Sequence, residues 1–158
     1  MCGIVGAIHL NESGNISQEM LRSMLALIQH RGPDEFGIFV DDWCGLGNSR
    51  LSIIDLSGGQ QPIGNEDGSL WIVFNGEIFN YIELRQDLEV RGHSFSTQSD
   101  TEVVLHMYEE YGQNCLNYLN GQFAIAIWDS KNHKAFLGRD RLGVRPIFYS
   151  IKNGCLYF

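Results

Sequence analysis

Apolar runs along the chain predict several short strands and three helices. Ile4–Leu10 is rich in β-branched residues and is followed by turn residues, which is typical of a buried strand. Apolar residues recur at helical spacing over Gln18–Gln29, and similar patterns predict a helix after Asn80 and another over Thr101–Tyr111. Further extended segments are predicted at Glu35–Val40, Cys44–Leu51, Leu70–Phe74, Ser94–Thr97, Phe123–Trp128, Lys134–Leu137, Pro146–Tyr149 and within Gly154–Phe158.

Polar and glycine-rich stretches separate these elements. Leu56–Gly68 is expected to be a loop, because turn-forming residues are dense there. Ser17 and Asn80 are predicted to cap the helices that follow them. Ser99 with Glu102 matches a capping box at the start of the third helix.

Length and charge exclude several classes of protein. The 158 residues are expected to form one domain with a substantial core. A net charge of -8 argues against binding to nucleic acids or anionic membranes, since both need a basic surface. No apolar run is long enough to span a bilayer and no secretion signal precedes the first strand, so a cytoplasmic location is expected.

The cysteines and histidines give little support to a metal site or a disulfide framework. Cys2, Cys44, Cys115 and Cys155 are widely spaced and form no C-x-x-C pair. The five histidines are scattered and show no i, i+4 pairing. No metal is therefore predicted, and the last three cysteines are expected to be ordinary core or surface residues.

Cys2 is the leading candidate for a nucleophile. If Met1 is removed, Cys2 carries both a thiol and a free α-amine, and the amine can accept the thiol proton. Free α-amines titrate at about pH 7.7–8.0, so a fraction is unprotonated near neutrality. The alternative is a buried structural cysteine, since free cysteines are often buried.

Four other residues are candidates for substrate binding or catalysis. Arg50 beside an apolar run is either a surface residue or a clamp for a carboxylate. Asn75-Gly76, directly after a strand, fits an oxyanion hole, and the alternative is a hairpin turn. Asp100 either stabilises the start of a helix or binds the ammonium group of a ligand.

Six motifs in this order resemble the glutamine amidotransferase domain of class II, a group of N-terminal nucleophile hydrolases. The resemblance is strongest to the N-terminal half of glutamine-hydrolysing asparagine synthetases, and it extends over almost the whole chain. The motifs are Cys2-Gly3-Ile4-Val5-Gly6, His30-Arg31-Gly32-Pro33-Asp34, Arg50-Leu51-Ser52-Ile53-Ile54-Asp55, Asn75-Gly76-Glu77-Ile78, Ser99-Asp100-Thr101-Glu102 and Gly138-Arg139-Asp140.

The resemblance implies a fold and a domain organisation. The fold would be α+β, a four-layer αββα sandwich of two stacked, mainly antiparallel sheets flanked by helices. Residues 1–158 would be a type 2 glutamine amidotransferase domain, truncated at its C-terminus, that needs no cofactor of its own. The ATP-dependent synthetase domain, with its ATP and Mg²⁺, is absent from this chain. Glutamine, that synthetase domain and a second copy of the chain are the partners the resemblance implies.

The resemblance also assigns roles to residues of the site. Glutamine would be hydrolysed to glutamate and ammonia through a thioester on Cys2, once Met1 has been removed. The ammonia would serve ATP-dependent synthesis of asparagine from aspartate in the full-length protein. The other assignments are Arg50 for the glutamine α-carboxylate, backbone groups of Ile53 and Ile54 near the substrate, Asn75 and Gly76 for the oxyanion hole, Glu77 for the glutamine side-chain amide and Asp100 for the α-ammonium group.

Two alternatives stay open. The domain could supply ammonia to a different acceptor, either another carboxylate or a sugar. If Met1 is retained, it could be a non-catalytic domain of the same fold, because an acylated α-amine cannot act as a base. The chain also departs from the family pattern at Asn48-Ser49, where a basic or histidine residue often precedes the Arg-Leu-Ser-Ile run.

Overall fold

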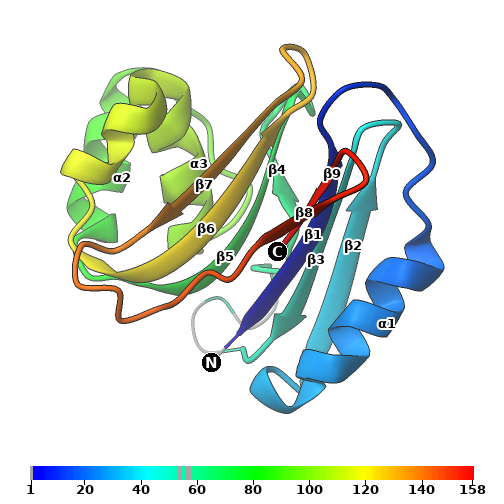
Figure 1. Cartoon of the computed structure of the whole chain (residues 1–158). Coiled ribbons are helices and arrows are strands. Elements are labelled where there is room, and N and C mark those ends of the chain that lie inside the picture. The colour runs from blue at the N-terminus through cyan, green and yellow to red at the C-terminus, as the bar shows by residue number, and fades with distance from the viewer. Residues whose placement is uncertain (1, 53–54, 56–57) are drawn as a thin grey trace.

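The computed structural model describes residues 2–52, 55 and 58–158 and has the expected αββα architecture (Figure 1). Two antiparallel sheets face each other, and helices cover both outer faces. Within these residues, no helix has the length and apolar character needed to cross a membrane. The helices are α1 (Gln18–Ile28), α2 (Tyr81–Val90) and α3 (Asp100–Tyr111), with 3₁₀ turns at Gln29–Arg31 and Gly112–Asn117.

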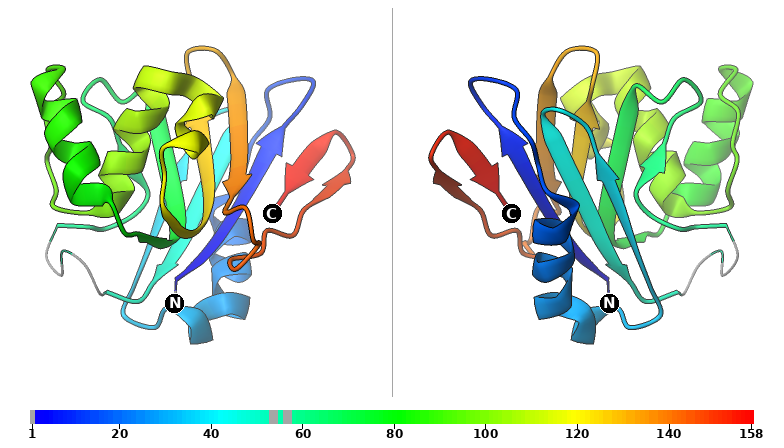
Figure 2. Two further views of the ribbon diagram at one scale, coloured as in Figure 1. Left: turned by 90° about the vertical axis from the view of Figure 1, so that its left-hand side faces the viewer. Right: turned by 90° about the vertical axis from the view of Figure 1, so that its right-hand side faces the viewer.

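The first sheet has five strands in the order β2-β3-β1-β9-β8. Its central strand β1 pairs with β3 so that Gly3 lies opposite Ser49, which brings the start of β1 to the end of β3. The hairpin of β8 and β9 forms one edge of this sheet, on the side away from α2 and α3 (Figure 2). The strands are β1 (Gly3–His9), β2 (Glu35–Val40), β3 (Cys44–Arg50), β8 (Ser150–Lys152) and β9 (Cys155–Tyr157).

The second sheet has four strands in the order β4-β5-β6-β7. The long β5 and β6 run antiparallel over their whole length, from Leu70 opposite Asp129 to Ile78 opposite Gly121. β4 pairs with β5 only at Ile72 and Trp71, so the rest of that edge of β5 is open to other partners. The strands are β4 (Ile63–Gly64), β5 (Leu70–Ile78), β6 (Gly121–Asp129) and β7 (Lys134–Arg139).

Three apolar layers hold the sandwich together. α1 packs on the first sheet through Leu21 and Leu25. α2 and α3 pack on the second sheet in the largest cluster. Alternate residues of the facing strands fill the space between the sheets, as the two-residue period of a strand requires. This middle layer contains Ile8, Cys44, Leu46, Val73, Ala126 and Trp128.

The structure corrects two predictions about strands. β5 does not end at Phe74 but continues through Ile78, so Asn75 and Gly76 lie within a strand. Pro146–Tyr149 is not a strand, and the chain enters β8 only at Ser150. In the second case the apolar pattern was present, but no neighbouring strand supplies the ladder of hydrogen bonds.

Two predicted caps differ in detail. Asn80 occupies the N-cap position of α2, yet its side chain bonds to the backbone of Tyr118 and Asn120 instead of the helix. Ser99 does cap α3, by accepting a hydrogen bond from the N–H of Thr101. Glu102 does not complete a capping box. Its carboxylate accepts bonds from Ser96 and Thr97 in the preceding segment.

Replacing Glu102 with glutamine should destabilise the fold. The carboxylate is 2% exposed and accepts four hydrogen bonds at 2.7–2.8 Å from backbone and hydroxyl groups. A glutamine amide has only one acceptor oxygen and presents an NH₂ group to the remaining donors, so we expect a loss of about 2 kcal/mol in the free energy of unfolding at pH 7. Urea unfolding measures the difference, with the exposed Glu12→Gln as control.

The destabilisation caused by Glu102→Gln should become smaller as the pH falls. Burial raises the pKa of Glu102, but the hydrogen bonds from Ser96 and Thr97 outweigh it and leave the pKa below its usual value. A depressed carboxyl pKa stabilises the fold above the pKa of the unfolded chain, and this stabilisation is lost as the pH falls through the folded pKa. The gap between wild type and Glu102→Gln should therefore close in acid. A gap that stays constant from neutral to acidic pH would contradict this explanation.

Candidate active site

Cys2 lies directly before β1, at the end of the layer between the two sheets. Its Sγ accepts a hydrogen bond from the N–H of Leu51 at 3.4 Å and lies 3.7 Å from the Leu51 carbonyl oxygen, to which the thiol donates. Arg31 Nε donates to the Cys2 carbonyl at 3.2 Å. The residue is only partly buried and lines a pocket, so its placement does not match a cysteine that merely fills a core.

Arg50 is the last residue of β3 and is held inside the same pocket. It is 4% exposed, which excludes the surface interpretation. Nη1 forms a 2.8 Å ion pair with Glu35 on the adjacent strand β2, and Nη2 donates to the carbonyl of Asp55 at 2.6 Å. A Cβ atom on Gly59 would lie 2.7 Å from Nη2, so a glycine is required there to accommodate the guanidinium.

Asn75 projects from β5 into the layer between the sheets. It lies on the same face of β5 as the buried Val73, and it is itself 5% exposed. Its side chain makes no hydrogen bond within the described part of the chain, although it lines the pocket with Cys2. A buried amide without a protein partner is suited to bind a group of the substrate.

The N–H of Gly76 points toward the pocket. Along a strand, successive N–H groups point to opposite edges. The N–H groups of Phe74 and Ile78 both point away from β6, since they donate to Gln61 Oε1 at 2.7 Å and to Asp100 Oδ2 at 3.0 Å. Gly76 lies between them and shares their orientation. A glycine is required at this position because a Cβ there would collide with the Gln122 carbonyl oxygen of β6.

Asp100 and Glu77 give the pocket its negative charge. Asp100 is the first residue of α3 and is 4% exposed, whereas Glu77 on β5 is exposed. Burial raises the pKa of Asp100, and the Glu77 charge raises it further against the opposing hydrogen bonds from the N–H groups of Ile78 and Thr101. A cation that binds beside Asp100 would relieve this unfavourable burial of negative charge.

One pocket therefore contains most of the residues predicted from sequence. Ile53 and Ile54 lie outside the described residues. Asn48 and Ser49, the departure from the family pattern, are buried and bond to backbone carbonyls of Phe74 and Gly32 instead of lining the pocket. The residues that line the pocket are Cys2, Arg50, Leu51, Gly59, Gln61, Phe74, Asn75, Gly76, Glu77, Ser99, Asp100, Thr101 and Arg145.

Sequence reasoning missed two polar residues of the pocket. Gln61 connects β5 to α3, since its Oε1 accepts from the Phe74 N–H and its Nε2 donates to Thr101 Oγ1 at 3.2 Å. Arg145 comes from the charged loop after β7. The only signal for it was the density of charge in that loop, and the loop conformation depends on Asp140.

Asp140 organises the loop that carries Arg145. Its buried carboxylate accepts hydrogen bonds from the N–H groups of Phe123 at 3.2 Å, Val144 at 2.9 Å and Arg145 at 3.0 Å. Burial raises the pKa of Asp140, but the backbone hydrogen bonds from Arg145, Val144, Phe123 and Gly143 outweigh it, and the pKa is lowered. The ionised carboxylate thus ties the loop to β6.

We expect Asp140→Asn to loosen this loop. The asparagine keeps the shape of the side chain but loses one acceptor oxygen and the charge that strengthens the bonds, which typically contribute about 1.5–3 kcal/mol each. Limited trypsin digestion should then cleave faster after Arg141, as followed by mass spectrometry. Asp42→Asn, in an exposed turn, is the matched control. Equal cleavage rates in the two variants would show that Asp140 does not hold the loop.

The pocket combines four chemical capacities. It has a thiol, a guanidinium, a pair of carboxylates and two candidate donors, the Asn75 amide and the Gly76 N–H, directed at one space. A zwitterionic amino acid with an amide in its side chain matches all four. Among the described residues, the side chains close enough together to hold a metal are Glu66, His93 and His106, and they lie outside this pocket.

Comparison with known proteins agrees with these features. Residues 1–158 match the family described as the glutamine amidotransferase domain. The chain is 44% identical to glutamine-hydrolysing asparagine synthetase 1 of Bacillus subtilis (strain 168), an alignment covering 100% of this chain and 25% of that protein. It is 38% identical to the glutamine-hydrolysing asparagine synthetase of Sandersonia aurantiaca, covering 94% of this chain and 28% of that protein. The chain thus spans about a quarter of the length of these relatives.

A solved structure supports the fold. The glutamine phosphoribosylpyrophosphate amidotransferase from B. subtilis, complexed with ADP and GMP, superposes with a TM-score of 0.79. The match covers 98% of this chain and 40% of that one at 23% sequence identity. At this identity the likeness concerns the fold alone, and it confirms the predicted αββα sandwich.

Proposed function

The chain belongs to the glutamine amidotransferase domain family, and on that premise we propose that its pocket hydrolyses glutamine to glutamate and ammonia through a thioester on Cys2. The observation that carries the proposal is the convergence of Cys2, Arg50, Asn75-Gly76 and Asp100 from separate elements on one pocket. Each supplies a group that the binding or cleavage of glutamine requires.

The charged groups bind the two ends of the amino acid. Arg50 takes the α-carboxylate, and its ion pair with Glu35 keeps the guanidinium in place. Asp100 takes the α-ammonium group. Glu77, on the same side of β5 as Asn75, accepts a hydrogen bond from the side-chain amide of the substrate. This arrangement directs the amide carbon of glutamine toward Cys2.

The reaction begins once Met1 has been removed and the α-amine of Cys2 is free. The amine accepts the thiol proton as the sulfur attacks the amide carbon, and the Asn75 amide and the Gly76 N–H stabilise the resulting oxyanion. The amine then returns the proton to the leaving nitrogen, and ammonia departs as the C–N bond breaks. Water attacks the thioester, and glutamate is released with the thiol restored.

In the intact protein we propose that the ammonia converts aspartate to asparagine. The support is the similarity to asparagine synthetases along the whole of this chain. The ATP and Mg²⁺ that activate the aspartate carboxylate would bind in a synthetase domain outside residues 1–158.

The four cysteines are all free, which fits our assignment of the enzyme to the reducing environment of the cytoplasm.

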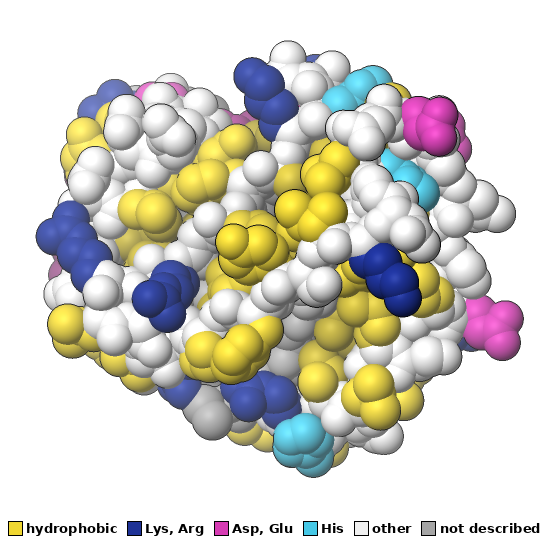
Figure 3. Space-filling model, in the orientation of Figure 1, with side chains coloured by type: hydrophobic (Ala, Val, Ile, Leu, Met, Phe, Trp, Pro, Cys, Tyr) yellow, Lys and Arg dark blue, Asp and Glu magenta, His cyan; other side chains and the backbone are white. Residues whose placement is uncertain are grey.

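An exposed apolar strip supports docking of the synthetase domain on this face of the molecule. Apolar side chains gather across the face that carries β8 and the segment before it (Figure 3). Exposed apolar surface of this extent is typical of an interface. The exposed large apolar side chains of this segment are Leu142, Val144, Phe148, Tyr149 and Ile151.

Nitrogen transfer tests both levels of the proposal. The intact protein is given glutamine labelled with ¹⁵N in its side-chain amide, together with aspartate and Mg-ATP, and the products are followed by NMR. We expect the label in the asparagine amide and one glutamate for each asparagine. If labelled ammonia accumulates free in solution and no label enters asparagine, aspartate is rejected as the acceptor, whereas glutamine hydrolysis is still supported. No glutamate at all would reject the amidotransferase assignment, and ¹⁵N-ammonium as the nitrogen source controls for a damaged synthetase domain.

A further inference from the structure

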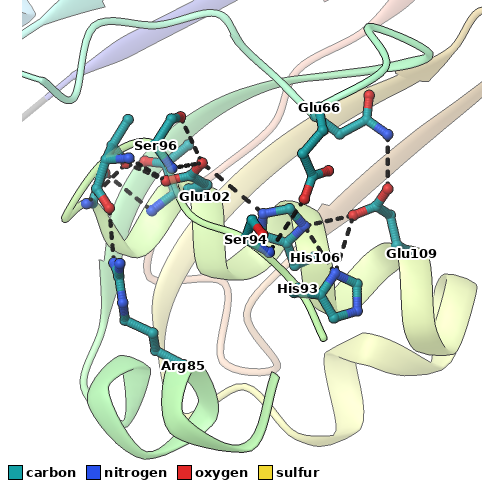
Figure 4. Close-up of polar contacts among 12 residues, drawn as sticks. Glu66, Arg85, His93, Ser94, Ser96, Glu102, His106 and Glu109 are labelled. Carbon is teal, nitrogen blue, oxygen red and sulfur yellow. Dashed lines mark hydrogen bonds and ion pairs between the residues drawn. The ribbon is translucent and has the colours of Figure 1, made fainter. Parts of the chain in front are cut away.

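A second polar cluster surrounds the middle of α3, outside the pocket that contains Cys2 (Figure 4). His106 and Glu109 come from α3, His93 follows α2, and Glu66 lies in the turn between β4 and β5. The Nδ1 atoms of the two histidines are 3.2 Å apart. Glu109 Oε2 lies 2.5 Å from His106 Nδ1 and 3.6 Å from His93 Nδ1. The nearest ligand atoms of Glu66 and the two histidines are all within 4.8 Å of one another.

We propose that His93, His106, Glu109 and Glu66 bind a divalent transition-metal ion, with Zn²⁺ as the best fit. Nitrogen and oxygen ligands in this number suit tetrahedral Zn²⁺. Zinc–nitrogen bonds of about 2.0–2.1 Å at a tetrahedral angle separate two nitrogens by about 3.3 Å. The observed separation of the two Nδ1 atoms, 3.2 Å, already matches that geometry.

The protons of the two histidines support this assignment. His93 Nε2 lies 3.0 Å from Glu110 Oε1 and donates to it, so His93 Nδ1 keeps its lone pair toward His106. His106 Nε2 has no hydrogen-bond partner within the described residues, although its side chain is 1% exposed. With an ion on both Nδ1 atoms, the His106 proton resides on Nε2. There it faces the Glu102 carboxylate, 4.0 Å away.

Three of the four proposed ligands also have a partner that orients them. Glu110 accepts a hydrogen bond from His93 Nε2, the arrangement in which a carboxylate supports a zinc-bound imidazole, whereas Glu102 lies 4.0 Å from His106 Nε2 without a hydrogen bond. Asn65 Nδ2 donates to Glu109 Oε1 at 2.7 Å, which leaves Oε2 directed at the histidines. The N–H of Ser94 donates to Glu66 Oε1 at 3.3 Å. These outer contacts distinguish the cluster from acidic residues that merely lie near one another on a surface.

Charge and access are both suitable for a cation. The carboxylates of Glu109, Glu102 and Glu66 all lie within 4.8 Å of a ring nitrogen of His106, which is itself buried. The field at this site therefore favours positive charge. A surface cavity of about 350 Å³, lined partly by Asn65, Glu66, Ser94 and Glu102, opens beside Glu66, so solvent reaches this one of the four ligands.

A bound ion would cross-link three parts of the domain. It would tie the segment after α2 and the turn before β5 to α3, the helix whose first residue, Asp100, lines the pocket. The role assigned to the ion is structural, because none of the four ligands lines the pocket that contains Cys2.

Metal titration of the intact protein, freed of metal by dialysis against a chelator, tests the site. We expect one equivalent of Zn²⁺ to bind, and free Zn²⁺ at a hundredfold excess over Kd to raise the melting temperature of this domain by about 5–10 °C. Co²⁺ in its place should give the intense visible absorption of a tetrahedral site. His93→Gln, a loop residue, should weaken binding at least ~100-fold, and Glu109→Gln should do likewise. The exposed His30→Gln should bind as wild type does.

Several outcomes would overturn the proposal. One is a melting temperature that does not respond to Zn²⁺, which would leave His106 as a protonated histidine in a cage of carboxylates. Another is unchanged binding in both His93→Gln and Glu109→Gln, with far-ultraviolet circular dichroism showing each variant folded. A third is a thiolate-to-cobalt charge-transfer band that disappears in Cys2→Ala, which would place the ion on the nucleophile instead.

Discussion

Cys2→Ala should abolish glutamine hydrolysis and leave the fold intact. The variant removes the atom that forms the thioester, so we expect kcat to fall at least ~10⁴-fold. Among the residues that the structure describes, Sγ makes only two long hydrogen bonds, both with the Leu51 backbone, so its removal should change the free energy of unfolding by no more than about 1 kcal/mol. Glutamate release from glutamine measures the activity, and urea unfolding measures the stability.

Cys155→Ala is the matched control for this experiment. Cys155 lies in β9 and packs in the cluster under α1, outside the pocket. Its replacement should leave kcat and KM for glutamine as in wild type. Hydrolysis that survives in Cys2→Ala would exclude the thioester route.

The same assay should be read together with the mass of the intact protein. Only molecules that have lost Met1 carry the free α-amine that accepts the thiol proton. We therefore expect the fraction of active sites to equal the fraction of molecules without Met1. Full activity in a preparation that retains Met1 would show that another group acts as the base.

Asn75→Ala should lower kcat by about 10²–10³ with a much smaller change in KM. The Asn75 amide is buried in the pocket and is proposed to bind the oxyanion, which exists only in the transition state, so its loss is felt in kcat. The Gly76 N–H remains, which is why the expected loss is smaller than for Cys2→Ala. Steady-state kinetics with glutamine separate the two parameters.

Asn75→Asp distinguishes electrostatics from packing. Aspartate has nearly the same shape as asparagine but places negative charge where the oxyanion forms, so kcat should fall at least as far as in Asn75→Ala. Asn15→Ala, in an exposed loop, controls for the handling of variant proteins. Near-normal kcat in Asn75→Asp would mean that the residue only fills space, and the oxyanion assignment would fail.

Local patterns predicted most of the secondary structure because short-range geometry determines it. The stripe of apolar residues over Gln18–Ile28 and the cap at Ser17 are enough to specify α1. The apolar residues of Pro146–Tyr149 looked equally convincing but form no strand, because a strand also needs a neighbour to complete its hydrogen bonds. The unexpected extension of β5 through Asn75–Ile78 has the same cause, since β6 pairs with it as far as Gly121.

The residues of the pocket also divide into those that the sequence predicted and those that only the structure revealed. Cys2, Arg50, Asn75, Gly76, Glu77 and Asp100 were found because each occurs in a motif that the family resemblance identifies, and the structure brings all six to one pocket. Arg145 and Gln61 have no such signal. Arg145 reaches the pocket only because the loop folds around Asp140, and Gln61 because its amide bridges the Phe74 N–H of β5 and the Thr101 hydroxyl of α3.

The sequence by itself determined the three helices and the chemistry available at the first residues of the chain, because these depend on residue types and on spacings of a few positions. The class of fold and the family were implied by the resemblance of six motifs to a known family. Only the tertiary structure decided which distant side chains meet. His93 and His106 are thirteen positions apart and share no helical face, yet packing of the segment after α2 on α3 brings their Nδ1 atoms to 3.2 Å. Proximity across elements depends on how those elements pack, and no local pattern encodes it.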